Sequence, residues 1–502
     1  MSQPDPETRQ PRRWLSMALG PALFLLVELL FRPELHLSDE LLAAYPSASP
    51  ALVRHALAST VWIAAWWFTE AIPIPATSLL PLVLFPALGL GESRDVARQY
   101  GHELMFLFIG GLLLAMAMER TGLHRRVALR IVRCFGSGRR ALVLGFMVAT
   151  ATISMWISNT ATTMLLLPVA LAVLSTTEDD GERRVDEAFP VALLLGIAFA
   201  ANIGGLGTPI GSPTNLIFQS VYQEKTGIEV SFVRWMGYGL PLVVVLLPLT
   251  WLYLVRGFRR GEGAEVVLPR FGPMTADQRW VTVVFFLTAI AWVTRGGFGE
   301  LPGWGPRLAA HGVHLTDSTV AVTAALVLFL APSKTTGRIL DWRVAPRLPW
   351  GVLLLLGAGF AISQAFDTSG LTLWIGTQIE GFGSLDWNPT LLLLALLVTV
   401  VGVSIVITEF ASNVASANIL LPILFGVSMA LGPERFPPDL LMVSAALACT
   451  TGFAMPAGTP PNALVFATER ISILRFAGTG VAIDLLSLVL IVGMMMARHL
   501  LA

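Results

Sequence analysis

The sequence contains few charged residues for its length. Asp, Glu, Lys and Arg together make up 13% of the 502 residues, whereas soluble globular proteins carry about 25%. The formal net charge is +0, so no bulk electrostatic attraction to nucleic acid or anionic partners is expected. Hydrophobic residues account for 55% of the chain and the mean hydropathy is +0.71. These values predict an all-α, polytopic membrane protein that spans the bilayer many times.

Cysteine is almost absent as well. Cys134 and Cys449 are the two cysteines of the chain, which argues against a disulfide framework and against a CxxC metal site. There is no HExxH motif, and no pair of Asp residues faces another across the predicted spans. An intramembrane hydrolase would need such groups, so the sequence predicts a protein that is not an enzyme and has no organic cofactor.

Long apolar runs are what the chain has in abundance. A membrane-spanning helix needs about 20 mostly apolar residues. The first run follows Arg12 and Arg13 and resembles a signal peptide, but no small-residue cleavage site follows directly, so we interpret it as a membrane helix. Eleven crossings are predicted near residues 14–31, 55–70, 74–90, 103–119, 187–218, 235–255, 279–295, 317–332, 349–367, 439–466 and 475–497.

Two further apolar segments, 141–175 and 390–430, are polar at their midpoints. Irregular backbone at membrane depth is tolerated only where protein buries it or where it lines a wet cavity. We therefore predict that both segments are re-entrant helical hairpins. Eleven crossings place the termini on opposite sides, and a cytoplasmic N-terminus leaves most Lys and Arg residues on the cytoplasmic side, as the positive-inside rule requires. Short loops favour the cell membrane, and specifically a bacterial inner membrane.

The second half of the chain echoes the first. "GLLLAMAMERTGL" (111–123) matches "GFAISQAFDTSGL" (359–371), "SNTATTMLLLP" (158–168) matches "SNVASANILLP" (412–422), and "TPIGSPTN" (208–215) matches "MPAGTPPN" (455–462). These ordered blocks are displaced by 248, 254 and 247 residues. The predicted organisation is an N-terminal segment with the first helix (1–54), a first repeat (55–260), a cytoplasmic linker (261–278) and a second repeat (279–502).

Each repeat contains five crossings and a hairpin, and because five is odd the two copies run through the membrane in opposite senses. The crossings 187–218 and 439–466 are both interrupted by Gly and Pro. Inverted repeats with paired broken helices are typical of secondary transporters. A channel is a weaker alternative, since two enclosed breaks at the membrane midplane suit alternating access better than a continuous pore.

The interrupted segments have the composition of an ion site. Ser, Asn and Thr satisfy free N–H groups at helix starts, so a Ser-Asn-Thr run can simply cap a helix; its recurrence in the second repeat favours a functional role. Four half-helix N-termini of about +0.5 each give nominally +2, which suits a dianion. The segments 141–175 and 439–466 contain no Lys or Arg. Because desolvating a dianion costs several kcal/mol per charge, we expect small cations, most simply sodium, to bind with it.

Glu409 is the single acidic residue of the segment 390–430. An intramembrane carboxylate is a functional candidate by default. It can equally be a structural group that is hydrogen-bonded to neighbouring helices, and the sequence leaves both interpretations open.

The hairpin motifs SNT and SNV, the following "LLLP" and "LLP", and the breaks that end in "GSPTN" and "GTPPN" resemble the divalent anion:sodium symporter family, the INDY-type di- and tricarboxylate transporters. The resemblance covers nearly the whole chain. It implies a homodimer in the lipid bilayer, whose mobile transport domains move in an elevator mechanism. The substrates that it implies are succinate, malate, fumarate, 2-oxoglutarate, citrate or, in one branch, sulfate.

The resemblance also implies site residues. The first sodium site would use Ser154, Ser158 and Asn159 and be closed around Gly211. The second would use Thr408, the Ala411 carbonyl and Asn413 and be closed around Gly458. The substrate carboxylates would meet a set drawn from both repeats: Asn159, Thr160, Ser212, Asn413, Val414, Thr459 and Pro460.

Val414 departs from the fuller family motif, which has Thr at this position. The valine removes one hydroxyl donor, which is worth about 0.5–1.5 kcal/mol, so the choice between dicarboxylate and citrate stays open. The resemblance favours sodium-coupled symport of C4-type dicarboxylates. Its alternatives are a dicarboxylate exchanger on the same fold and a sodium:sulfate symporter.

Overall fold

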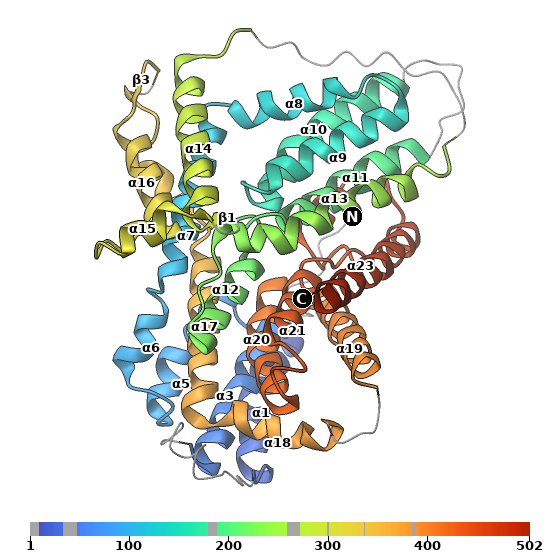
Figure 1. Cartoon of the computed structure of the whole chain (residues 1–502). Helices are drawn as coiled ribbons and strands as arrows, with labels where there is room; N and C mark the ends of the chain where they lie inside the picture. The colour runs from blue at the N-terminus through green and yellow to red at the C-terminus, as the bar shows by residue number, and fades with distance from the viewer. Residues whose placement is uncertain are drawn as a thin grey trace.

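The computed structural model describes residues 10–33, 48–178, 188–258, 272–298, 301–335, 337–383 and 388–501. Most of these residues lie in helices (Figure 1). In this part of the chain the strands form two short antiparallel pairs, β1 (Gly297–Phe298) with β2 (Leu301–Pro302) and β3 (Pro332–Ser333) with β4 (Gly337–Arg338). The predicted helical class is confirmed, whereas the two strand pairs were not predicted.

The first half of the chain contributes twelve of the described helices. They are α1 (Gln10–Leu30), α3 (Pro50–Thr69), α4 (Ile74–Thr77), α5 (Pro81–Ala87), α6 (Ser93–Gln99), α7 (Glu103–Arg120), α8 (Leu123–Cys134), α9 (Arg139–Ser154), α10 (Asn159–Glu178), α11 (Ala188–Gly205), α12 (Pro213–Thr226) and α13 (Phe232–Leu254). The predicted span 74–90 is divided into α4 and α5, because Pro81 at the start of α5 lacks the N–H group that a continuous helix needs there.

The second half begins at α14, after a predicted linker of which residues 261–271 lie outside the described residues. Its helices are α14 (Ala276–Arg295), α15 (Trp304–Ala309), α16 (Asp317–Leu330), the 3-10 helix η2 (Trp342–Arg347), α17 (Trp350–Ser369), α18 (Leu371–Gly383), α19 (Pro389–Phe410), α20 (Asn413–Leu431), α21 (Pro438–Ala448), α22 (Pro460–Phe466) and α23 (Ile473–Leu501).

Seven helical segments of the described chain are long and apolar enough to cross a membrane. They are Ser93–Arg120, which joins α6 to α7, and the helices α11, α13, α17, α19, α20 and α23. This composition makes the protein a multi-pass membrane protein. Since α19 and α20 have 22 and 19 residues, length alone does not distinguish a hairpin from two crossings, and the predicted number of eleven crossings remains a prediction.

The two halves contain the same series of elements. The pair α7 and α8 has its counterpart in α17 and α18, and the chain turns between the two members of each pair at Gly122 (φ 69°) and Gly370 (φ 81°). Glycine adopts this left-handed conformation without steric cost. The helix pair α9/α10 corresponds to α19/α20, and the broken helix α11/α12 corresponds to α21/α22.

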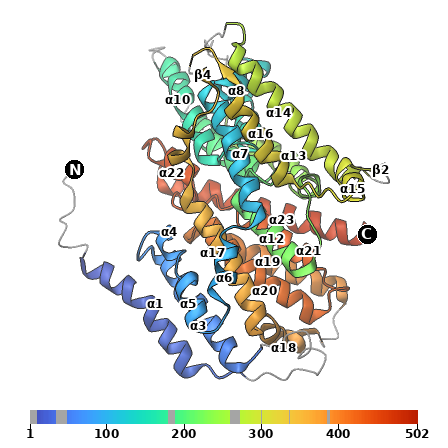
Figure 2. The same cartoon turned by 90° about the vertical axis from the view of Figure 1, so that its left-hand side faces the viewer.

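These corresponding elements pack crosswise between the halves. Helix α10 of the first half packs against α22 of the second half, and α20 of the second half packs against α12 of the first half. Figures 1 and 2 show α8, α9 and α10 towards one end of the molecule and α18 and α20 towards the other. The two breaks therefore lie together inside the molecule, where helices of both halves meet.

Candidate functional site

The tip of the first helix pair holds a cluster of oxygens. Helix α9 ends at Ser154 and α10 begins at Asn159. The Ser154 hydroxyl lies 2.6 Å from Asn159 Oδ1 and 2.7 Å from the Ala201 carbonyl oxygen of α11. A hydroxyl has one proton, so three oxygens lie close together with one proton between them. Such a proton-poor cluster is a favourable place for a small cation.

The tip of the second helix pair repeats this cluster. The Thr408 hydroxyl lies 2.7 Å from Asn413 Oδ1 and 2.7 Å from the Cys449 carbonyl oxygen of α21. Ser154 and Thr408 are both buried, with 0% exposure. Hydroxyl, amide and peptide oxygens are the ligands that hard cations prefer. We call these sets the first oxygen cluster (Ser154, Asn159, Ala201) and the second oxygen cluster (Thr408, Asn413, Cys449).

Each break is held by one asparagine at the start of the following helix. Asn215 Nδ2 donates to the carbonyls of Gly205 (2.9 Å) and Thr208 (2.8 Å). In the second half, Asn462 Nδ2 donates to the carbonyls of Gly452 (3.1 Å) and Met455 (3.2 Å). The asparagines that end "GSPTN" and "GTPPN" therefore satisfy carbonyls that the interrupted helices leave free.

The two breaks are hydrogen-bonded to each other across the halves. Asn202 Nδ2 donates to Thr459 Oγ1 (2.9 Å), and the Asn202 side chain also accepts from Asn159 Nδ2 (3.3 Å). In the opposite direction, the Thr450 hydroxyl lies 3.4 Å from Ser212 Oγ and 2.7 Å from Thr214 Oγ1. The structure thus brings Ser212 and Thr459, both assigned from sequence, to the junction between the halves.

The predicted closing glycines have different surroundings. Gly211 packs against Gly205, and a Cβ atom on Gly205 would lie 2.7 Å from Asn159 Oδ1. Gly458 instead faces Glu409, whose Oε2 would lie 3.1 Å from its Cβ atom. Glycine is needed at Gly205 because the backbone approaches the first oxygen cluster too closely for a side chain.

The remaining residues predicted for the site lie outside the two oxygen clusters. Ser158 is exposed and its hydroxyl caps α10 by accepting from the Ala161 N–H (3.3 Å). Ala411 ends α19, and its N–H donates to Ile407. Thr160 is half-buried, Val414 is 9% exposed and Pro460 is exposed. The structure locates these last three at the starts of α10, α20 and α22, without a bond from their side chains to either oxygen cluster among the described residues.

Several site residues were missed from sequence. Ala201 and Cys449 contribute through their carbonyls, which any residue type possesses, so no sequence signal marks them. Asn202 and Thr450 correspond to each other in the two repeats, 248 residues apart, and could have been found by extending the repeat alignment. Asp484, a single acid in the apolar helix α23, is the clearest missed signal.

Glu409 makes defined structural contacts. Its carboxylate accepts the N–H groups of Ala454 (2.7 Å) and Met455 (2.6 Å) in the second break. Asp484 accepts the N–H of Phe453 (3.0 Å). Glu409 is thus hydrogen-bonded to the second break, as the structural interpretation expects, and Asp484 is a second acid there that the sequence analysis did not consider.

An aromatic stack receives the tip of the first helix pair. The Trp156 ring stacks on Phe232 and Trp292 at centroid distances of 6.1 and 6.4 Å, and its edge meets Phe285 at 4.8 Å. Phe410, which like Trp156 stands three residues before its tip asparagine, is 72% exposed. The two tips thus have different environments in this structure.

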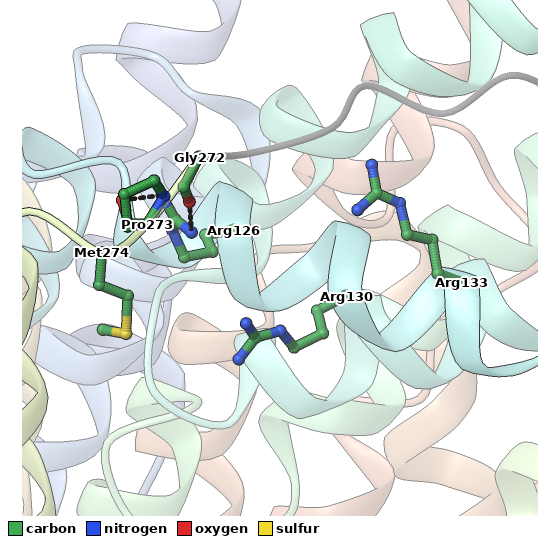
Figure 3. A pocket seen from close by; sticks show the side chains of 6 residues that line it. All are labelled: Arg126, Arg130, Arg133, Gly272, Pro273 and Met274. Atoms are coloured by element: carbon green, nitrogen blue, oxygen red, sulfur yellow. Dashed lines mark hydrogen bonds between the residues drawn. The ribbon is translucent and has the colours of Figure 1, made fainter.

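A surface pocket lies on α8, apart from the oxygen clusters. Figure 3 shows Arg126, Arg130 and Arg133 around it, with Arg126 donating to the carbonyls of Gly272 (2.6 Å) and Pro273 (3.2 Å). No residue of α8 has a bond to the oxygen clusters within the described ranges. The predicted topology places these arginines on the cytoplasmic side of the membrane.

Comparison with known proteins gives consistent results. Residues 64–448 match the family model described as citrate transporter. The chain is 40% identical to the sodium-dependent dicarboxylate transporter SdcS of Staphylococcus saprophyticus over 494 residues, which cover 95% of this chain and 90% of that protein. It is 39% identical to SdcS of Staphylococcus aureus strain USA300, covering 95% and 89%.

A solved structure shares the fold. The crystal structure of the Alcanivorax borkumensis YdaH transporter, described as having an unusual topology, superposes with a TM-score of 0.56 at 16% sequence identity. The match covers 80% of this chain and 86% of that chain.

Proposed function

The chain belongs to the citrate transporter family and, within it, to the sodium-dependent dicarboxylate transporters of the divalent anion:sodium symporter type, and from this we propose that it is a secondary active transporter. It moves C4-type dicarboxylates such as succinate, malate and fumarate into the cell together with sodium ions. It carries out no chemical conversion and needs no organic cofactor.

The pair of oxygen clusters is the observation that carries this proposal. One sodium ion binds at the first oxygen cluster, with Ser158 and the backbone around Gly211 completing its ligands. The other binds at the second oxygen cluster, with the Ala411 carbonyl and the backbone around Gly458. Each cluster has three oxygens within hydrogen-bonding distance and one hydroxyl proton, so a cation relieves the repulsion between oxygens that the proton cannot.

The dicarboxylate binds between the clusters, at the starts of four helices. Helices α10, α12, α20 and α22 begin at Asn159, Pro213, Asn413 and Pro460, and their N-termini favour negative charge. Asn159 and Thr160 line one side of the site and Asn413 and Val414 the other, with Ser212, Thr459 and Pro460 nearby. Val414 supplies no hydroxyl, so one donor fewer is available to the second carboxylate of the substrate.

Coupling follows from charge. The first four residues of each of these helices include no Lys or Arg, and a dianion is costly to desolvate without positive charge. Sodium ions supply that charge, so the anion and the cations each raise the other's affinity, and this linkage is reciprocal.

The inverted repeats provide the means of alternating access. We place eleven crossings and two re-entrant hairpins in each protomer of a homodimer in a bacterial inner membrane, with the N-terminus in the cytoplasm and the C-terminus outside. The broken helices and hairpins form the moving unit of an elevator mechanism. The crosswise packing of α10 on α22 and of α20 on α12 supports a unit in which both breaks move together.

Uptake of labelled succinate into proteoliposomes tests the function. An inward sodium gradient should drive uptake into empty vesicles, and replacing all alkali cations by N-methylglucamine should abolish it. Uptake that requires preloaded succinate and ignores sodium would instead identify an exchanger. Displacement of the label by sulfate but not by malate would identify a sulfate carrier.

A further inference from the structure

The two breaks are related by the repeat but are held by different chemistry. In the second break, three consecutive N–H groups are bound by carboxyl groups: Phe453 by Asp484 (3.0 Å), and Ala454 and Met455 by Glu409 (2.7 and 2.6 Å). Glu409 and Asp484 are 6% and 7% exposed, and their carboxyl groups are hydrogen-bonded to each other, so the pair shares one proton and carries one negative charge. The second break is thus supported by two buried acids.

The first break has no acid at either corresponding position. Met155 corresponds to Glu409, since each directly follows the hydroxyl residue of its oxygen cluster, Ser154 or Thr408. Val243 corresponds to Asp484, since each stands four residues after the helix glycine that faces its break, Gly239 or Gly480.

Neutral groups hold the first break instead. Trp235 Nε1 donates to the Leu206 carbonyl (3.0 Å), and the Thr208 hydroxyl donates to the Met155 carbonyl. Indole and hydroxyl donors bind carbonyls without adding charge. The first break therefore contributes only dipoles to its oxygen cluster.

The acids of the second break lack a positive partner in the protein. Neither Glu409 nor Asp484 forms an ion pair within the described residues. An intramembrane negative charge without a counter-charge is expensive. Thr408 of the second oxygen cluster directly precedes Glu409, so a cation bound there is the nearest available counter-charge.

A second observation in the same break points to a cation. Asn462 Oδ1 is a buried oxygen, with 0% exposure of the residue, and it has no hydrogen-bond partner among the described residues. Its counterpart Asn215 Oδ1 accepts from the Thr214 hydroxyl (3.3 Å). The second break therefore has both more negative charge and more unsatisfied oxygen than the first.

We propose that Glu409 and Asp484 are positioning residues of the second sodium site, which they make the tighter of the two sites and the first to be filled. The inference depends on the proposed sodium coupling and adds an order to it. The carboxyl groups fix the backbone of the second break and stabilise the cation through the single negative charge of the pair. They do so without binding the dicarboxylate.

Sodium titrations of purified protein test this order. The midpoint of the sodium-dependent rise in Tm is measured without substrate, beside the sodium dependence and maximal rate of succinate uptake. Glu409→Gln removes the charge and should raise the sodium midpoint by on the order of tenfold, as loss of a nearby unit charge in a medium of intermediate dielectric predicts. The maximal rate of succinate uptake should fall by a smaller factor than the sodium midpoint rises, because saturating sodium fills the weakened site.

Matched variants separate charge from structure. Glu409→Asp keeps the charge and should restore the sodium midpoint towards the wild-type value. Asp484→Asn should raise it by a smaller factor. Glu434→Gln, which removes an exposed acid from the loop between α20 and α21, should leave it unchanged.

The outcomes distinguish this inference from the proposed function. If the Tm of the wild-type protein does not change with sodium concentration, the proposed function itself is refuted. A wild type that responds, together with a Glu409→Gln variant of unchanged midpoint, refutes the order of filling alone. If Glu409→Gln does not fold, the Asp484→Asn titration decides the question by the same criterion.

Discussion

At the scale of single residues, Asn159 and Asn413 each present Oδ1 to an oxygen cluster, and Asn159 Nδ2 also donates to Asn202. An amide carries its acceptor and its donor on separate atoms, so it can contact a cluster and a second partner at once. Alanine removes both.

Replacing either asparagine should therefore stop transport. Asn159→Ala and Asn413→Ala should each reduce sodium-driven succinate uptake at least about tenfold, because a hydrogen bond or ligand contact to a charged group is worth about 1.5–3 kcal/mol. Asn388→Ala is the matched control, since Asn388 is exposed and caps α19 away from the clusters. Near-normal uptake by either site variant, with a normal Tm, would show that the assignment is wrong.

The residue scale also shows where sequence reasoning ends. The duplicated Ser-Asn motif indicates Asn159 and Asn413, because recurrence at matching places is improbable for a simple helix cap. Sequence cannot indicate Ala201 or Cys449, whose side chains do not take part. Asp484 was overlooked because a lone acid in α23 has meaning only once the fold places it against the second break.

At the scale of elements, the tips of the two helix pairs are packed differently. Trp156 at the first tip is packed on Phe232, Trp292 and Phe285, whereas the corresponding Phe410 at the second tip is 72% exposed. Alternating access in an inverted-repeat transporter exchanges the environments of corresponding elements. The first tip must then leave the aromatic stack during the cycle.

A cross-link across this contact should arrest the cycle. In a Cys134→Ser background, the pair Trp156→Cys with Phe285→Cys joins positions whose rings lie 4.8 Å apart. A bifunctional methanethiosulfonate reagent, which spans the space that the two rings occupied, should lower succinate uptake at least about tenfold, as expected when a gating element is immobilised, and reduction should restore it. Trp156→Cys alone, treated with the same reagent, controls for modification of a single site. Full transport by the cross-linked protein would mean that this tip stays docked throughout.

Elements were predictable where their pattern was long or repeated. The predicted Gly- and Pro-rich interruptions of the crossings 187–218 and 439–466 agree with the gaps between α11 and α12 and between α21 and α22. Gly and Pro disfavour a helix in both places. The short amphipathic helices α8 and α18 were missed, since neither is long enough to look like a span. The division of 74–90 was missed because its apolar composition outweighed the prolines.

At the scale of the whole molecule, both halves of the chain contribute residues to one candidate site. The order of the three repeated blocks predicts the duplication of elements, and an odd number of crossings in each half predicts that the halves run through the membrane in opposite senses. The crosswise bonds of Asn202 with Thr459 and of Thr450 with Ser212 could not be predicted, because sequence gives no distance between the halves.

Two repeats of five crossings together with the first helix give eleven crossings, and this odd number predicts that the chain ends on opposite sides of the membrane. An epitope tag before Met1 should be cleaved by protease only in inside-out vesicles, and a tag after Ala502 only in right-side-out vesicles. An odd number of crossings requires this result, independently of whether the two helix pairs are hairpins or pairs of crossings. Cleavage of both tags in the same preparation would contradict it, and cleavage of both after detergent treatment controls for access.

The bond between Asn202 and Thr459 joins residues 257 positions apart. During biosynthesis the ribosome delivers Asn202 to the translocation machinery long before Thr459 has been translated. The amide of Asn202 therefore lacks Thr459 as a partner until the second half of the chain has been synthesised and inserted. Final closure of the core is thus a late event of synthesis, and a prematurely terminated chain ends with its polar interior exposed to quality-control proteases.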